Sequence, residues 1–168
     1  MHLYLRTHVA AAPAQVWQGF TRELFLALAP PFPPFRLRRF DGCHRGDEVH
    51  IELGAGPLRY LWTSLITDHG VTPDGTYYFV DEGRQLPPPL RQWRHRHLMQ
   101  PAPDGGTYIV EDLEYTAGAG LLDRLLWPAM WAQFAWRRPI YRRWFGAPGK
   151  PLLPQNAATG SAVAPTAV

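Results

Sequence analysis

The segment from residue 121 to about 145 limits the possible folds of this chain more than any other part. When it is placed on a helix, its apolar residues occupy nearly every direction around the axis. They are Leu122, Leu125, Leu126, Trp127, Met130, Trp131, Phe134, Ile140, Tyr141, Trp144 and Phe145. A helix that is apolar on so many sides is usually buried on more than one of them. We therefore expect a long helix, kinked or split at Pro128 and Pro139, around which a curved sheet wraps.

The centre of the chain alternates with a period of two, which is typical of β-strands. The expected strands are Phe35 to Phe40, Asp47 to Leu53, Leu58 to Asp68, Tyr77 to Glu82, Arg91 to Gln100 and Tyr108 to Thr116. Short turn sequences such as Asp41-Gly42 and Asp74-Gly75 separate them, so successive strands should pair antiparallel. With a further strand at Leu3 to Ala11, the sequence predicts an α+β fold with about seven strands.

The remaining ordered segment, Pro13 to about Ala29, has helical spacing and predicts one helix or two short ones. The prolines between residues 30 and 34 must end it. A chain of 168 residues suits one domain, which we place at residues 1–146. Residues 147–168 lack periodicity and predict a flexible C-terminal tail.

Composition excludes several classes of function. The formal net charge is only +3 and the arginines are spread along the chain, so nothing indicates a nucleic-acid-binding module. No apolar run is long enough to span a membrane, and the first residues do not resemble a secretory signal. A single cysteine, Cys43, excludes an internal disulfide. These features favour a cytoplasmic protein, and nothing in the sequence indicates its oligomeric state.

Two motifs carry a resemblance to a known superfamily. The first is the segment 11–20, AAPAQVWQGF, and the second is FVDEG at 79–83 followed by WRHRH at 93–97. In their order and spacing they resemble the START-like (SRPBCC) superfamily, which includes polyketide cyclase/dehydrase and lipid-transfer proteins, and within it a bacterial ligand-binding subgroup. The resemblance implies a helix-grip fold. It implies little about function, because binding proteins, cyclases and hydrolases share this scaffold.

The strand at Arg91 to Gln100 holds the main candidate residues. Alternation puts Trp93, His95 and His97 on one face and two arginines on the other, so the histidine face should point inward. In one interpretation each histidine only hydrogen-bonds a neighbour and fixes the core. In the other, the pair forms the polar end of an apolar pocket.

The candidate partners of the two histidines lie on the neighbouring strands. They are Glu82 (or Asp81, which faces the opposite way) on the preceding strand and Glu111 or Asp112 on the following one. A carboxylate beside a histidine raises the imidazole pKa, and together they would orient a ligand that carries a carbonyl, carboxylate or hydroxyl group. The same His-x-His pair plus a carboxylate would also suit zinc or iron. Because no second ligand pair is evident, we predict no bound metal and no other cofactor.

Aromatic residues are numerous enough to line a cavity between the sheet and the long helix. The residues predicted to bind a ligand are Trp62, Trp93, His95, His97, Tyr108, Trp127, Trp131 and Phe134. Tyr78, Phe79 and Tyr115 are further aromatic candidates. The sequence therefore favours a protein that binds a small hydrophobic or amphipathic molecule, lipid-like or polyketide-like.

Two other functions stay open. The first is a cyclase or dehydratase that uses His95, His97 and a carboxylate, Glu82 or Glu111, as general acid and base. The second is a protein-interaction module, which an exposed tryptophan-rich patch on the long helix would favour. The arginines at 137, 138, 142 and 143 are expected on a solvated helix face, where weak contact with an anionic membrane surface is an alternative use.

Overall fold

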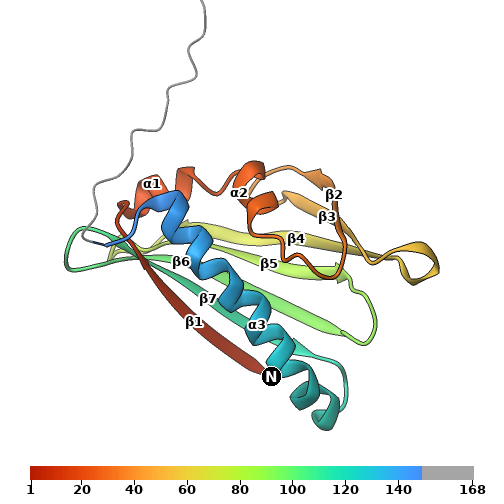
Figure 1. Ribbon diagram of the computed structural model, residues 1–168. Helices are drawn as coiled ribbons and strands as arrows, with labels where there is room; N and C mark the ends of the chain where they lie inside the picture. Colours follow the sequence, from red (N-terminus) through yellow and green to blue (C-terminus); the bar gives the residue numbers. More distant parts are fainter. Residues whose placement is uncertain (149–168) are drawn as a thin grey trace, which may run out of the picture.

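A seven-stranded antiparallel sheet is the main element of the computed structural model, which describes residues 1–148 (Figure 1). Its strands are β1 (His2–Val9), β2 (Phe35–Phe40), β3 (Glu48–Leu53), β4 (Tyr60–Val71), β5 (Tyr77–Gln85), β6 (Gln92–Pro101) and β7 (Thr107–Thr116). The strand order is β1-β7-β6-β5-β4-β3-β2, so β2 to β7 form the predicted meander and β1 adds beside β7. The predicted α+β fold is confirmed.

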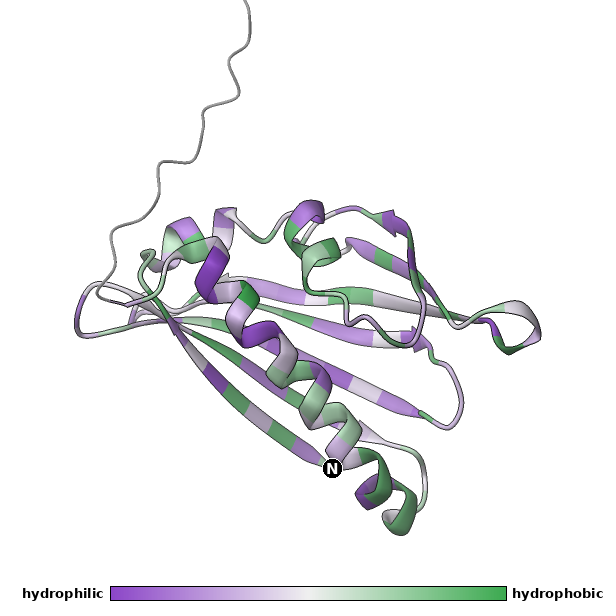
Figure 2. Cartoon of the chain, in the orientation of Figure 1, coloured by the Kyte–Doolittle hydropathy of each residue, from purple (hydrophilic) through white to green (hydrophobic). Residues whose placement is uncertain are grey.

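The strands show the expected alternation of buried and exposed side chains. Along β1, Leu3, Leu5, Thr7 and Val9 are buried while the residues between them are more exposed. Figure 2 shows the same alternation as hydrophobic and hydrophilic bands along the strand. This period-two pattern fixes which face of the sheet packs on the core, because a shift by one residue would turn every side chain over.

Two short helices follow β1. The sequence allowed either one helix or two short ones here. These are α1 (Pro13–Gln18) and α2 (Arg22–Ala27), and Pro13 occupies the first helical position of α1. Thr21 separates them because its hydroxyl accepts a hydrogen bond from the backbone N–H of Leu24 and so caps α2.

The long helix α3 (Gly120–Phe145) crosses one face of the sheet, and Pro128 and Pro139 do not split it (Figure 1). Phe134, Tyr141 and Phe145 are buried on the side that faces the sheet. The prediction that the sheet buries this helix on most sides is wrong. The sheet meets one stripe of α3, and six large apolar side chains of the helix stay exposed: Leu121, Leu125, Trp127, Trp131, Trp136 and Trp144.

Backbone hydrogen bonds join the end of α3 to the start of the chain. The N–H groups of Ala10 and Ala11 donate to the carbonyl oxygens of Gly146 and Phe145, at 2.9 and 3.0 Å. Within residues 1–148, no helix is both long enough and apolar enough to cross a membrane. Apart from residues 147 and 148, the predicted C-terminal tail lies outside the described residues.

The contact between α1 and α3 depends on the absence of a side chain at Gly19, which gives the first testable prediction. A Cβ at Gly19 would lie 2.3 Å from Cε1 of the buried Phe145 ring, although the backbone there has an ordinary helical φ of −81°. We expect Gly19→Ala to lower the free energy of unfolding by about 1–3 kcal/mol, measured by urea denaturation, because the ring must move.

Gly120→Ala is the matched control for this substitution. A Cβ at Gly120 would meet no heavy atom of the described chain within 4 Å. This variant should unfold at the same urea concentration as the wild type or slightly above it, since alanine favours helix over glycine. Equal stability of the two variants would show that Gly19 is not a tight contact.

Candidate functional site

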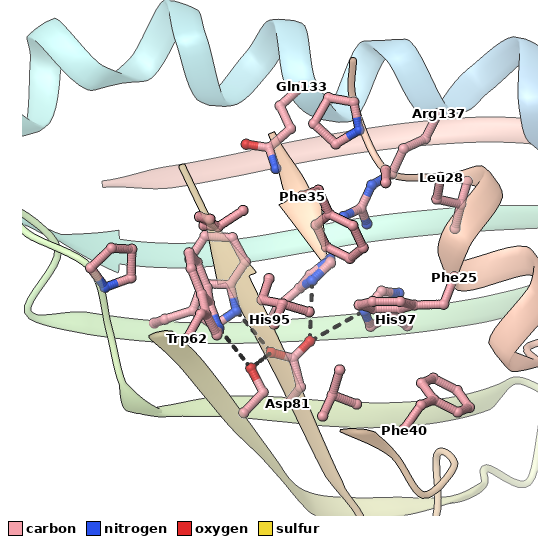
Figure 3. Close-up of a pocket in the computed structure, with 18 of the residues that line it drawn as sticks. Phe25, Leu28, Phe35, Phe40, Trp62, Asp81, His95, His97, Gln133 and Arg137 are labelled. Carbon is pink, nitrogen blue, oxygen red and sulfur yellow. Dashed lines mark hydrogen bonds and ion pairs between the residues drawn. The ribbon is translucent and has the colours of Figure 1, made fainter. Parts of the chain in front are cut away.

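A cavity of about 280 Å³ lies between the inner face of the sheet, the α1–α2 segment and α3 (Figure 3). Most of its wall is apolar. Seven phenylalanine and tryptophan residues contribute to that wall: Phe20, Phe25, Phe35, Phe40, Trp62, Phe79 and Trp93. Ionisable and polar side chains gather at the part of the wall formed by β4, β5, β6 and α3, so the cavity has an apolar body and one polar region.

Strand β6 supplies the centre of the polar region. Trp93, His95 and His97 all point inward and are buried, with only 2% of His95 and 7% of His97 exposed. Arg94 and Arg96 point outward, as the alternation requires. The His97 ring stacks on Phe79 of the neighbouring strand with 4.1 Å between the ring centroids.

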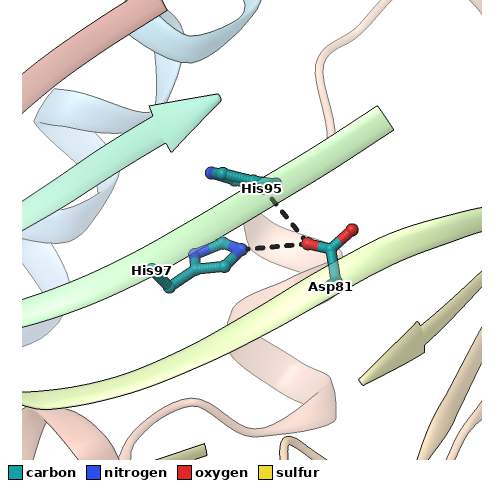
Figure 4. A group of neighbouring side chains, drawn as sticks. All are labelled: Asp81, His95 and His97. Atoms are coloured by element: carbon teal, nitrogen blue, oxygen red, sulfur yellow. Dashed lines mark hydrogen bonds and ion pairs between the residues drawn. The ribbon is translucent and has the colours of Figure 1, made fainter. Parts of the chain in front are cut away.

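Asp81 on β5 faces both histidines (Figure 4). Its Oδ2 atom lies 3.4 Å from His95 Nδ1 and 3.3 Å from His97 Nε2. Its Oδ1 atom accepts hydrogen bonds from Trp93 Nε1 at 2.8 Å and from Ser64 Oγ at 3.2 Å. The carboxylate is therefore held from one side and presents its second oxygen to the imidazoles.

From the sequence, Glu82 is the preferred partner of the histidines and Asp81 the alternative. In the structure Asp81 is the partner. Asp81 is the residue in register with His95, whereas Glu82 is in register with Arg94 and lies outside, 3.6 Å from that guanidinium. The sequence could not assign the faces of β5, because residues 77 to 80 are all apolar and carry no alternation.

Glu111 on β7 lies on the other side of the histidines and is only 2% exposed. Its Oε2 atom is 2.7 Å from His95 Nε2 and 3.4 Å from His97 Nδ1. Neither contact has hydrogen-bond geometry, so within residues 1–148 both ring nitrogens are buried without a hydrogen-bond partner. Asp112, the other candidate on this strand, faces outward and pairs with Arg96 and His2.

Helix α3 satisfies the second oxygen of Glu111. The Tyr141 hydroxyl donates to Oε1 at 2.6 Å, and Arg137 Nη1 lies 3.3 Å from the same atom. The prediction that Arg137 lies on a solvated helix face is wrong, because its side chain is only 15% exposed and faces Glu111. Helical spacing could have revealed this: Arg137 follows the buried Phe134 by three residues and precedes the buried Tyr141 by four.

The buried groups shift one another's pKa values. Burial alone would raise the pKa of Asp81 and of Glu111. The histidines around Asp81, and Arg137 with the histidines around Glu111, outweigh burial and lower both values. Burial and the neighbouring His95 lower the pKa of His97 to about 4. For His95 the two carboxylates outweigh burial and raise the pKa.

These shifts set the charges of the cluster. Asp81 and Glu111 stay ionised at neutral pH and face the Arg137 guanidinium, while the raised pKa of His95 favours its protonated form and the lowered pKa of His97 favours its neutral form. Burial and the nearby Glu111 raise the pKa of Tyr141, so its hydroxyl stays protonated and able to donate. Buried ions persist when they are paired in this way.

Only some of the aromatic residues that were predicted to bind a ligand line the cavity. Trp62 and Trp93 line the cavity, and Phe134 packs against Trp93 and His95 behind the lining. Tyr108 does not line it, since it alternates with the inward Ile109 and lies under the Arg6 guanidinium on the outer face.

Trp127 and Trp131 also lie outside the cavity lining. They are 37% and 43% exposed, because the sheet covers only one stripe of α3. Their exposure, with that of Trp136 and Trp144, is the one observation that favours the protein-interaction alternative.

Several residues of the cavity wall were not identified from the sequence. Ser64 and Gln133 are isolated polar residues in apolar segments, and no sequence pattern marks them. Cys43 also lines the cavity, where burial raises the pKa of its thiol to about 12. This thiol is therefore un-ionised at neutral pH and is a poor nucleophile.

Comparisons with known proteins give structural matches only. No protein-family model matches the sequence. Among curated proteins, none matches it either. The Zhui aromatase/cyclase from Streptomyces sp. R1128 is 14% identical, over 85% of this chain and 94% of that one, with a TM-score of 0.56. A norcoclaurine synthase point mutant from Thalictrum flavum, in complex with a transition-state analogue, is 12% identical, over 80% and 89%, with a TM-score of 0.56.

A third solved structure, protein Ms6760 from Mycobacterium smegmatis, is 20% identical over 83% of this chain and 89% of that one, with a TM-score of 0.52. All three matches extend over most of the chain, although so few residues are identical. Together with the seven-stranded sheet and the C-terminal helix, they show that the chain has a helix-grip fold, the fold that the resemblance to the START-like superfamily implies.

Proposed function

We propose that this protein binds a compact hydrophobic or amphipathic molecule in the cavity between the sheet and α3. The observation that carries this proposal is the cavity itself, whose aromatic wall ends in one polar region at Asp81 and His97. Pockets that bind small molecules are mostly apolar, with a few polar groups that fix orientation. This wall has that composition.

The size of the cavity narrows the class of ligand. At about 280 Å³ it is close to the lower end of the roughly 300–1,000 Å³ of small-molecule pockets. A molecule of two or three fused rings suits this volume and the aromatic wall better than a lipid with two acyl chains. The titles of two solved structures with this fold name enzymes, an aromatase/cyclase and a norcoclaurine synthase, and the second holds a small molecule.

An enzyme of the cyclase or dehydratase type is a second candidate. It is favoured by the contact of 3.3 Å between His97 Nε2 and Asp81 Oδ2 at the cavity wall, where a base could reach a ligand, with His95 beside Asp81 as the candidate acid. Mass spectrometry of a ligand before and after its incubation with the protein separates the two candidates. An unchanged mass supports binding alone, and a product supports the enzyme.

Filling the cavity should weaken the binding of an apolar probe. The neutral fluorophore N-phenyl-1-naphthylamine should bind the wild type in a 1:1 ratio. Val49→Phe places a ring in the cavity wall, so we expect at least about tenfold weaker binding in a fluorescence titration, equal to about 1.4 kcal/mol. Val71→Phe is the matched control, because Val71 is exposed on β4 and does not line the cavity. Equal affinities in both variants would place the probe elsewhere.

The polar region should make the cavity prefer a ligand with a hydroxyl group. We expect the wild type to bind 2-naphthol about three- to tenfold more tightly than naphthalene, the usual contribution of one hydrogen bond. His97→Phe keeps a ring against Phe79 but removes the polar nitrogen, so the preference should disappear in calorimetric titrations. Glu82→Gln, on the outer face of β5, should keep it. If His97→Phe retained the preference, the histidines would have only a structural role.

A further inference from the structure

We propose that Asp81, His95 and His97 bind one divalent first-row transition-metal ion, such as zinc or iron(II), at the polar region of the cavity. The sequence alone favours a metal-free pocket, because it shows no second ligand pair. The structure identifies the carboxylate that faces both histidines as Asp81. The proposal goes beyond the binding of a hydrophobic molecule and does not depend on it.

The spacing of the three side chains is the first argument. Asp81 Oδ2 is 3.4 Å from His95 Nδ1 and 3.3 Å from His97 Nε2, and the three residues offer one ligand atom each within 4.8 Å of one another. These distances are long for charge-assisted hydrogen bonds, which are about 2.7–2.9 Å. Two atoms that each lie about 2.0–2.1 Å from a tetrahedral zinc ion are about 3.4 Å apart. The long hydrogen bond of His97 to Asp81 and the ion-pair contact of His95 in Figure 4 therefore have the spacing of ligands around one ion.

The second argument is the support of Asp81. Trp93 and Ser64 both donate to Oδ1, and the Trp62 indole in turn donates to Ser64 at 2.9 Å. Carboxylates that bind metals are usually hydrogen-bonded through a second shell that sets their orientation. Here that shell directs Oδ2 at the two imidazoles.

The third argument is the position of Glu111. Within the described chain, His95 Nε2 and His97 Nδ1 are buried without hydrogen-bond partners, and both lie near Glu111 Oε2, at 2.7 and 3.4 Å. Coordination through the opposite nitrogens would fix a proton on each of these atoms. A small rotation of each ring would then let both protons be donated to Glu111, the carboxylate–histidine–metal arrangement of many metal sites. One ion would thereby satisfy two otherwise unpaired buried groups.

The ion would also face the ligand. Asp81, His95 and His97 all line the cavity, so the coordination positions that they leave free open toward it. Sites with three protein ligands keep an open position for water or substrate. An oxygen atom of a bound molecule would take that position, which makes the ion the anchor for the polar end of the ligand.

The test is metal binding by the full chain, made without a histidine tag and purified without a metal column. After removal of metal with EDTA, the protein should bind Zn²⁺ at a ratio of 1:1 in equilibrium dialysis, and Co²⁺ should give a visible absorption band of low coordination number. Asp81→Asn and His97→Ala should each weaken Zn²⁺ binding by at least about 100-fold. Trp93→Phe, which removes one donor to Oδ1, should weaken it about 10- to 100-fold.

Two variants serve as controls for binding at the surface. Glu82→Gln changes a carboxylate on the outer face of β5, and His50→Ala removes a histidine that contacts Glu48 outside the cavity. Both should bind Zn²⁺ like the wild type. Urea unfolding in EDTA checks that each variant is folded, and N-phenyl-1-naphthylamine binding in EDTA tests the apolar cavity separately. The proposal is overturned if the folded wild type takes up no Zn²⁺ at micromolar concentrations, or if Asp81→Asn and His97→Ala bind it unchanged.

Discussion

The buried carboxylate of Glu111 is the group on which the arrangement of this protein depends. A charge that is 98% removed from solvent is tolerated only where other groups supply compensating charge and hydrogen bonds. Two of these groups, Tyr141 and Arg137, come from α3, and the third, His95, comes from the sheet. Satisfying one side chain therefore fixes both the rotation of the helix and its position along the sheet.

The polar cluster also separates the two apolar parts of the interior. One hydrophobic cluster includes Val16, Leu24 and Phe145, and the other includes Leu3, Trp93 and Phe134. Replacing a buried ion cluster by apolar residues of similar volume is often neutral or stabilising, so such clusters are weak devices for stability. The position of this cluster beside a cavity therefore supports the proposed role in binding, because departures from a uniformly apolar core are expected at functional sites.

The sequence predicts the fold of this chain well and its site only in part. The period of two in the central strands and the turns between them place all seven strands, because alternation and turn chemistry are local properties. The same alternation turns His95 and His97 inward. It fails at β5, where Tyr77 to Val80 carry no alternation, so Asp81 is identified only by its register with His95. It also fails for the burial of α3, since apolar residues on every side of a helix do not show how much of it the sheet covers.

The pairing of β1 with β7 has a consequence for how the protein is made. Leu3 pairs opposite Leu113, so β1 has no partner until more than a hundred further residues have been synthesised. At translation rates of about 5–20 residues per second, this delay is roughly 5–20 s. During that interval the apolar side of β1, with Leu3, Leu5 and Val9, is exposed on a nascent chain. Chaperones that bind short extended apolar segments would therefore meet β1 before the strand that pairs with it.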